Sequence, residues 1–304
     1  GTLASTGYNK GNTPNNGATA IGAGARSGFS GNYKNNGFVP NNEETDADSS
    51  DIVVAKAFGT TTSTLESYKY NSVDINEGTA LGRQARAIGD QAIAIGGQVI
   101  AGMASIALGG NDITQIANKK YFKSTKDNFK VTETTDYDQA ATESSRTISE
   151  TYNDLVGTKL DTAYKSTYAQ DGSVVLGMQS HSGTPLGTAI GTNALVRKGA
   201  FGATAIGAGS QVQANAEAAV AIGMGSFADG KYAVAAGTAS LAKEGDVAIG
   251  YKANATGKEG ALAIGLGTNA QGDSSIMIGG ADIKSASAQT IKYQESTGGI
   301  TSRN

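Results

Sequence analysis

The stretch Val220-Ala221-Ile222-Gly223 decides the fold, because closely similar tetrapeptides recur twelve times along the chain. Each has a β-branched residue, a small residue, Ile or Leu, and a closing glycine, with few departures. Consecutive closing glycines are mostly 13 to 16 residues apart. A short fixed period predicts a solenoid, in which each repeat buries its apolar face by stacking on its neighbours. The closing glycines are Gly22, Gly82, Gly96, Gly109, Gly177, Gly191, Gly207, Gly223, Gly237, Gly250, Gly265 and Gly279.

Both faces of the repeated strand are apolar or bare. Successive side chains of a strand point to opposite faces, so the bulky pair shares one face while the small residue and the glycine share the other. Such a strand belongs to a parallel sheet that is covered on both sides. Small residues three and five positions after the closing glycine predict a second strand in each coil, which supplies one cover. These pairs are Ala194 and Val196, Ser210 and Val212, Ser226 and Ala228, Ser240 and Ala242, and Ala253 and Ala255.

The second cover is expected to come from other copies of the chain. Copies of the ladder would pack around a symmetry axis, where Ala and Gly allow a close approach of the backbones. We therefore expect an all-β parallel β-roll of about 12 to 14 coils, each of about 14 residues, in an obligate homo-oligomer. The pattern leaves open which strand face meets the partner and whether two or three copies meet. The candidate core and subunit-contact ladder is Ile190, Ile206, Ala221, Ile222, Ala248, Ile249, Ala263 and Ile264.

The composition fits a thin molecule and argues against several classes of function. The 304 residues include 43 Gly, 3 Pro and no Trp, so the chain lacks the bulk for a thick core. Without cysteine, it has neither disulfides nor thiolate metal sites. A net charge of −3 supplies no overall basic field for nucleic acid or an anionic membrane. No stretch approaches the roughly 20 apolar residues of a membrane-spanning helix.

The period is interrupted twice, and we assign insertions to residues 26–78 and 111–172. Together they hold 30 of the 51 charged residues and 13 of the 19 Tyr and Phe residues. Insertions in a repeat array map to surface loops, where recognition usually takes place. The first insertion contains an acidic run and a predicted strand at residues 52–58. The acidic run is Glu43, Glu44, Asp46, Asp48 and Asp51.

The second insertion carries a cluster of lysines with aromatic residues between them. We take this cluster as the candidate ligand-binding surface, because it suits an acidic protein or a sulfated glycan. The alternative is a solvated loop whose lysines pair with Glu133, Asp136, Asp138 and Glu143. Apolar spacing favours an amphipathic helix over residues 144–165, broken at Gly157, with a long β-hairpin as the competing interpretation. The cluster is Lys119, Lys120, Tyr121, Phe122, Lys123, Lys126, Phe129 and Lys130.

No motif in the chain supports catalysis, a cofactor or a metal. The Gly-x-Gly stretches recur in register and are each followed by another predicted strand, so we interpret them as turns rather than phosphate loops. His181 is the single histidine, and we place it in the turn of a coil without a catalytic or metal-binding role. The turns lack the regular aspartates of calcium-binding β-rolls. The Thr rows of an ice-binding face do not continue through the array.

The repeats resemble the head repeats of trimeric autotransporter adhesins, the YadA-like heads of Gram-negative bacteria. The resemblance covers most of residues 18–280 outside the insertions. The two charged insertions resemble most those of the ubiquitous surface protein A adhesins of Moraxella. The signature stretches include Ser105-Ile106-Ala107-Leu108-Gly109, Ala219-Val220-Ala221-Ile222-Gly223 and Asp246-Val247-Ala248-Ile249-Gly250.

The resemblance implies a left-handed parallel β-roll, three of which associate side by side. In the family, a coiled-coil stalk carries the head and a C-terminal β-barrel anchors it in the outer membrane. We expect residues 1–280 to be the head and residues 281–304, which show no sustained heptad pattern, to be a connector toward a missing stalk. The only membrane attachment would then be the absent C-terminal anchor.

The resemblance also implies the function. Family heads attach bacteria to matrix proteins such as fibronectin, laminin or collagen, to cell receptors, or to each other. We therefore expect a non-enzymatic, homotrimeric adhesin head on the bacterial cell surface. It would bind host matrix or cell-surface molecules, and no nucleic acid. The alternatives are a self-associating biofilm module, a glycan-binding module, and a structural spacer in a surface fibre.

Overall fold

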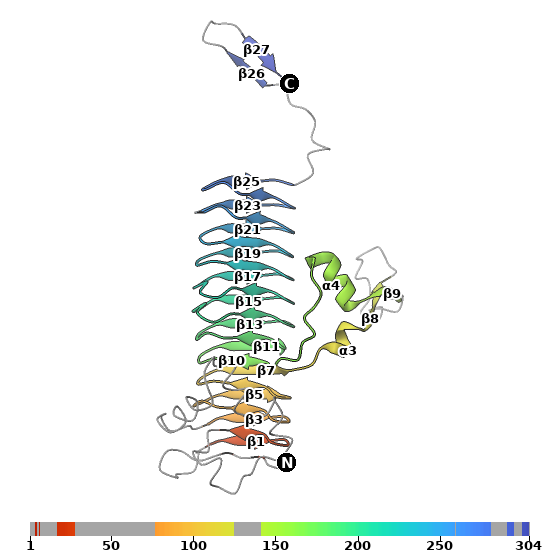
Figure 1. Cartoon of the computed structure of the whole chain (residues 1–304), viewed down its shortest axis with the longest axis vertical. Coiled ribbons are helices and arrows are strands. Elements are labelled where there is room, and N and C mark those ends of the chain that lie inside the picture. The colour runs from red at the N-terminus through yellow and green to blue at the C-terminus, as the bar shows by residue number, and fades with distance from the viewer. Residues whose placement is uncertain are drawn as a thin grey trace, which may run out of the picture.

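The computed structural model describes residues 4, 6, 17–27, 77–124, 141–258 and 260–280, and the backbone of residues 291–294 and 300–303. Its main body is a parallel β-solenoid in which each coil except the last, at β25, contributes one strand to each of two sheets (Figure 1). The prediction of an all-β parallel roll is confirmed. Sheet 1 has twelve strands: β1 (Thr19–Ile21), β3 (Thr79–Leu81), β5 (Ile93–Gly96), β7 (Ile106–Gly110), β11 (Val174–Met178), β13 (Thr188–Ile190), β15 (Thr204–Ile206), β17 (Val220–Ile222), β19 (Val234–Ala236), β21 (Val247–Ile249), β23 (Leu262–Ile264) and β25 (Ile276–Ile278).

Sheet 2 is formed by the predicted second strand of each coil. Its eleven strands are short, and each pairs in parallel with the strands of the neighbouring coils. They are β2 (Arg26–Ser27), β4 (Arg86–Ala87), β6 (Ile100–Ala101), β10 (Tyr168–Ala169), β12 (His181–Ser182), β14 (Leu195–Val196), β16 (Gln211–Val212), β18 (Phe227–Asp229), β20 (Leu241–Lys243), β22 (Asn254–Ala255) and β24 (Asn269–Ala270).

The strands stack in strict register, so that each position of the repeat forms a ladder along the roll. In β15 and β17, Ala205 pairs with Ala221 and Ile206 with Ile222. From β3 to β23 the small residue of the tetrapeptide, alanine in every strand except β11 where it is Val175, points inward and is fully buried, as are Val212 and Ala228 from sheet 2. The core is therefore a thin layer of small side chains between two sheets of one chain.

This position of the alanines corrects one expectation. Of the candidate ladder, Ala221, Ala248 and Ala263 lie inside the roll, whereas the isoleucines lie on its outer face. The short alanine side chains allow sheet 1 to approach sheet 2, not one chain to approach another. Both faces of the strand are apolar, which is why the pattern alone did not distinguish the inner face from the outer one.

The closing glycines form a ladder of their own. Gly207 has φ of +126°, a conformation that is almost restricted to glycine. A Cβ atom on Gly207 would lie 2.6 Å from the carbonyl oxygen of Gly223 in the next coil. The repeat therefore ends on glycine for two reasons, the backbone conformation and the close contact between coils.

The first insertion lies mostly outside the described residues, including its acidic run and the predicted strand at 52–58. Its start at residue 26 is corrected, because Arg26–Ser27 forms β2 and pairs with β4. At its other end, the carbonyl of Gly78 already accepts a hydrogen bond from the Thr19 amide at 2.8 Å. The roll therefore includes residues at both ends of the predicted insertion.

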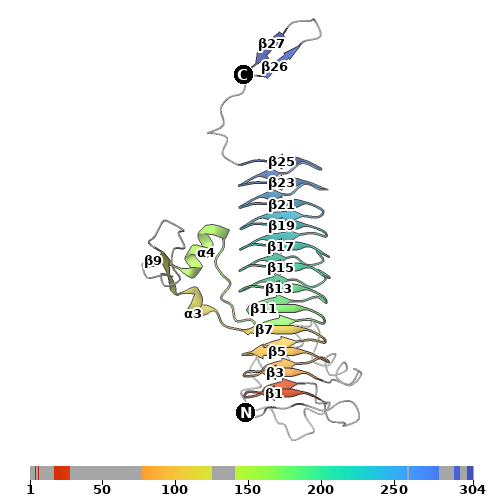
Figure 2. The same ribbon diagram turned by 180° about the vertical axis from the view of Figure 1, so that it is seen from behind.

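The second insertion leaves the roll after β7 and returns at β10, earlier than the predicted end at residue 172. We call residues 111–166 the arm; they are described at 111–124 and 141–166. The arm projects from one side of the roll in both views (Figures 1 and 2). Its elements are α3 (Thr114–Ala117), β8 (Lys120–Ser124), β9 (Ala141–Thr147) and α4 (Ile148–Val156), with β8 and β9 antiparallel.

The helix predicted at residues 144–165 is confirmed only in its middle. Thr147 and Glu150 form a capping box that starts α4, and Gly157 ends the helix with φ of +88°. Residues 144–147 belong instead to β9, so the hairpin alternative is also present in part. Residues 158–165 are not helical.

In the segment predicted as a connector, β26 (Ile291–Gln294) and β27 (Ile300–Arg303) form an antiparallel hairpin. Neither of the described helices has the length and apolar character needed to cross a bilayer.

Candidate functional site

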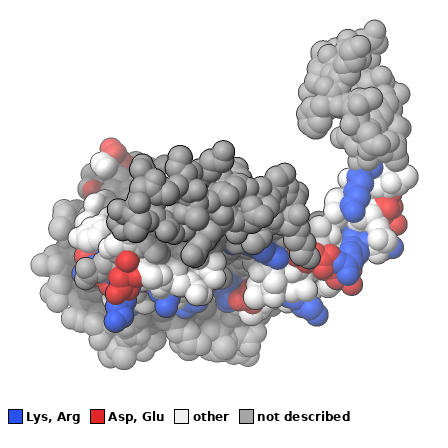
Figure 3. All heavy atoms as spheres, turned by 90° about the horizontal axis from the view of Figure 1, so that it is seen from above, with Lys and Arg blue, Asp and Glu red and all other residues white. Residues whose placement is uncertain are grey.

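The described lysines of the predicted ligand surface lie at the outer end of the arm. Lys119, Lys120 and Lys123 are exposed, and Phe122 exposes 70% of its surface. Basic and acidic side chains lie close together on the described part of the arm (Figure 3). Lys126, Phe129 and Lys130 lie outside the described residues, as do Glu133, Asp136 and Asp138.

The contacts of these lysines within the arm are weak. The Lys120 Nζ atom lies 3.8 Å from a Glu143 carboxylate oxygen, and both side chains are about half exposed. Lys123 Nζ lies 5.8 Å from the centre of the Tyr121 ring. Exposed contacts of this kind contribute at most about 1 kcal/mol each, so the lysines remain available to a partner.

The arm is anchored on the turns of the roll by a small apolar cluster. Ile113, Tyr152 and Leu160 are buried together and pack against Met178 and Met224 of the roll. Burial raises the pKa of the Tyr152 hydroxyl. This packing places α4 against the turns that follow β15 and β17.

Two glycines of the roll make room for this helix. A side chain at Gly209 would overlap Tyr152, and one at Gly225 would overlap Val156. The equivalent position in another coil holds Ala239 with φ of +56°, so the turn itself does not require glycine. Gly209 and Gly225 therefore serve the docking of the arm as well as the turn.

Hydrogen bonds hold the last part of the arm, residues 158–166, which we call the strap. The Asn193 side-chain amide donates to the Asp161 carbonyl at 2.7 Å. At the start of the arm, the Gln179 side-chain amide donates to the Asn111 carbonyl at 2.6 Å. The Thr167 hydroxyl donates to the Gly110 carbonyl at 2.8 Å, so the two ends of the insertion meet at the roll.

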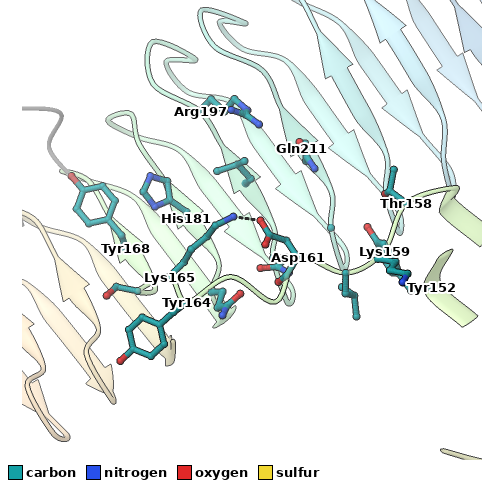
Figure 4. Close-up of a pocket in the computed structure, with 16 residues that line it drawn as sticks. Tyr152, Thr158, Lys159, Asp161, Tyr164, Lys165, Tyr168, His181, Arg197 and Gln211 are labelled. Atoms are coloured by element: carbon teal, nitrogen blue, oxygen red, sulfur yellow. Dashed lines mark hydrogen bonds and ion pairs between the residues drawn. The ribbon is translucent and has the colours of Figure 1, made fainter. Parts of the chain in front are cut away.

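A cavity of about 500 Å³ lies between the strap and the outer face of sheet 2. Lys165 and Asp161 of the strap form an ion pair in front of the coils that carry His181, Arg197 and Gln211 (Figure 4). The side-chain hydrogen bond from Lys165 is the main reason that the pKa of Asp161 is lowered. Sequence reasoning missed this cavity.

His181 lies in β12, not in a turn as expected. Its ring centre is 4.9 Å from that of the buried Tyr168, at an angle of 43°. Burial lowers the pKa of His181 to about 4, with further contributions from the charges of Lys165 and Arg197. The imidazole is therefore neutral at physiological pH.

The outer face of sheet 1 is an apolar ladder that none of the described residues covers. The β-branched residue and the Ile or Leu of each tetrapeptide point to this face, and Ile222 and Ile249 expose 43% and 41% of their surface. Large apolar patches rimmed by polar residues mark protein contacts. The ladder residues that are most exposed are Ile21, Ile106, Leu108, Ile222, Ile249, Ile276 and Ile278.

The comparisons with known proteins agree with this fold. The family model described as the YadA head domain repeat matches the chain twice, at residues 76–98 and 242–259. No curated protein and no solved structure matches the chain. The two matched segments lie in opposite halves of the roll. Together with the in-register repeats, they support a YadA-like head of the trimeric autotransporter adhesin class.

Proposed function

We propose that the chain is a non-enzymatic, homotrimeric adhesin head that binds host matrix or cell-surface molecules at the surface of a Gram-negative bacterium. The observation that carries this function is the arm, which is docked on a YadA-type roll and presents exposed lysines and aromatic residues. A loop held in place by a rigid scaffold is the usual location of a recognition surface.

The trimer is supported by the exposed ladder of sheet 1. Burying one Ile or Val side chain completely stabilises an association by about 1.5–3 kcal/mol. The ladder repeats in every coil, so a partner chain would bury many such side chains at once. Identical chains provide matching ladders with the same spacing, which favours a closed homo-oligomer.

The proposed ligand surface is the lysine cluster that begins at Lys119, just before β8, and continues through β8 into the segment after it. Its partners would be matrix proteins of the fibronectin, laminin or collagen class, or cell receptors. Acidic surfaces on these partners would be attracted by Lys119, Lys120 and Lys123. Solvated aromatic residues such as Phe122 would supply apolar contact. The charged insertions also underlie our proposal that the chain is a head of the ubiquitous surface protein A type.

The test is removal of the arm. Because Thr167 contacts Gly110, residues 111–166 can be replaced by a short Gly-Ser linker without moving β7 or β10. Deletion up to residue 172 would remove β10 and damage the roll. The shortened chain should keep its circular dichroism spectrum and lose binding to immobilised matrix proteins. Unchanged binding would move the site onto the roll.

A second variant separates the lysines from the rest of the arm. Lys119→Glu, Lys120→Glu and Lys123→Glu together reverse the exposed positive charge at and just before β8 and should weaken binding at low salt. The matched control is Lys198→Glu, Lys243→Glu and Lys252→Glu together, which reverses three exposed lysines on the roll. Equal losses in the two variants would mean that only net charge matters.

A further inference from the structure

We propose that the cavity between the strap and sheet 2 is a binding site for an acidic sugar, one or two rings long, whose carboxylate is held by Arg197. The site is separate from the lysine surface at the end of the arm and makes a different contribution to recognition. It is built by residues that are distant in sequence, since the strap covers coils formed by β12, β14 and β16.

The size and lining of the cavity suit a small polar ligand. Its volume of about 500 Å³ lies within the range of about 300–1,000 Å³ that is usual for small-molecule sites. Leu195 is an apolar residue of the floor, whereas most neighbours are amides, phenols and charged groups. A sugar matches such a lining, because each hydroxyl can both donate and accept a hydrogen bond.

The charges in the lining favour an anion. Lys159, Lys165 and Arg197 bring three positive charges, and Asp161 brings one negative charge that is paired with Lys165. Within the part of the chain that the structure describes, the Arg197 guanidinium has neither an ion pair nor a side-chain hydrogen bond. Its planar fork fits a carboxylate through two parallel hydrogen bonds. A ligand carboxylate would supply the ion-pair partner that the Arg197 guanidinium lacks among the described residues.

Neutral polar groups beside Arg197 could form hydrogen bonds with the hydroxyls of the sugar ring. The Gln211 amide makes no side-chain hydrogen bond among the described residues, and it lies in the coil next to that of Arg197. His181 is neutral, so its ring offers one donor and one acceptor to the cavity. Gln179 is 3% exposed, and its buried Oε1 atom has no hydrogen-bond partner in the described structure. Tyr164, about half exposed, adds an aromatic ring at the opening.

The strap that closes the cavity is held independently of any ligand. Asn193 binds the Asp161 carbonyl, and Leu160 is buried in the apolar cluster below α4. The site is therefore largely formed before binding, which reduces the ordering cost that a ligand must overcome. The cavity opens on sheet 2, so covering the apolar ladder of sheet 1 in a trimer leaves this face outside that contact.

The experiment titrates the full 304-residue chain with two acidic sugars, a glucuronic-acid disaccharide and 3′-sialyllactose, by ligand-observed NMR and calorimetry. Lactose and sodium acetate serve as the neutral-sugar and carboxylate controls. We expect at least one acidic sugar to bind at least tenfold more tightly than either control. Binding by only one acidic sugar identifies the ring that fits and supports the site. Equal binding of lactose or acetate, or the absence of binding, overturns it.

Variants locate the binding in the cavity. Arg197→Gln should weaken binding at least about tenfold, since a charged hydrogen bond is lost, and Arg197→Lys should fall between Gln and the parent. Lys198→Gln, the adjacent cation outside the lining, should bind as the parent does. Equal losses in Arg197→Gln and Lys198→Gln overturn the assignment. A changed molar mass for Arg197→Gln also overturns it, because the cavity would then be a subunit contact.

Discussion

Replacing a closing glycine by alanine tests why the repeat ends as it does. In Gly207→Ala, the new Cβ would lie 2.6 Å from the Gly223 carbonyl oxygen and 2.7 Å from its carbonyl carbon. The residue would also have to keep φ near +126° or change the turn that joins the two sheets. Both effects act in one coil and are transmitted to its neighbours by the stacked register.

The expected loss follows from these two effects. A glycine-only backbone conformation costs about 1–3 kcal/mol for another residue, and overpacking against backbone atoms costs a similar amount. We therefore expect the free energy of unfolding to fall by about 3–5 kcal/mol per chain. The midpoint of thermal unfolding should fall by roughly 5–10 °C.

The matched control is Gly202→Ala in the preceding turn. Gly202 has φ of +66°, which alanine tolerates at a cost of about 1 kcal/mol, and a Cβ there would meet no atom within 4 Å. Thermal and denaturant unfolding of both variants, followed by circular dichroism, give the comparison. If Gly207→Ala were no less stable than Gly202→Ala, the account of the glycine ladder would be refuted.

Three further predictions concern buried charge and the docking of the arm. His181 has a folded pKa of about 4, below its unfolded value, so stability present above about pH 6.5 should be lost as the pH falls toward 4. The free energy of unfolding should fall by about 2 kcal/mol, which is less than the full pKa shift implies, because the ring is partly exposed to solvent. Urea titrations at several pH values should show this loss in the parent and not in His181→Gln. Burial raises the pKa of Asp246, so the folded form is penalised once this carboxyl is ionised, and the unfolding free energy of Asp246→Asn relative to the parent should rise as the pH is raised from acid to 7. Asn retains an acceptor for the Ala261 amide at this position, and a difference between the two chains that does not change with pH would contradict the reasoning. Gly225→Gln should displace Val156 and expose the arm to trypsin, whereas Ala239→Gln at the equivalent turn should not; equal cleavage rates would argue against docking at Gly225.

The sequence predicts the solenoid well because its evidence is local and repeated. The tetrapeptide defines the strand, its period defines the coil, and pairs such as Ser210 and Val212 define the second strand. The break predicted at Gly157 is confirmed, since a glycine in the left-handed conformation is a local signal, but the helix does not resume after it as predicted.

Long-range contacts account for what the sequence did not predict. The docking of Tyr152 against Gly209 and the cavity in front of His181 depend on where a long insertion returns to the roll. The positive φ at this turn position did not mark Gly209 as a docking site, because Asn193 and Ala239 adopt a similar φ at the equivalent position. The inner face of the strand was also undecided, because alanine and isoleucine are both apolar and only the thickness of the roll selects alanine.

We propose that further copies of the chain cover the apolar ladder of sheet 1. Sedimentation equilibrium at micromolar concentration tests it directly. We expect a species of three times the 30.6 kDa chain mass, and a smaller species when Ile222→Glu and Ile249→Glu place charges in the ladder. A folded, stable monomer of the unaltered chain would contradict it.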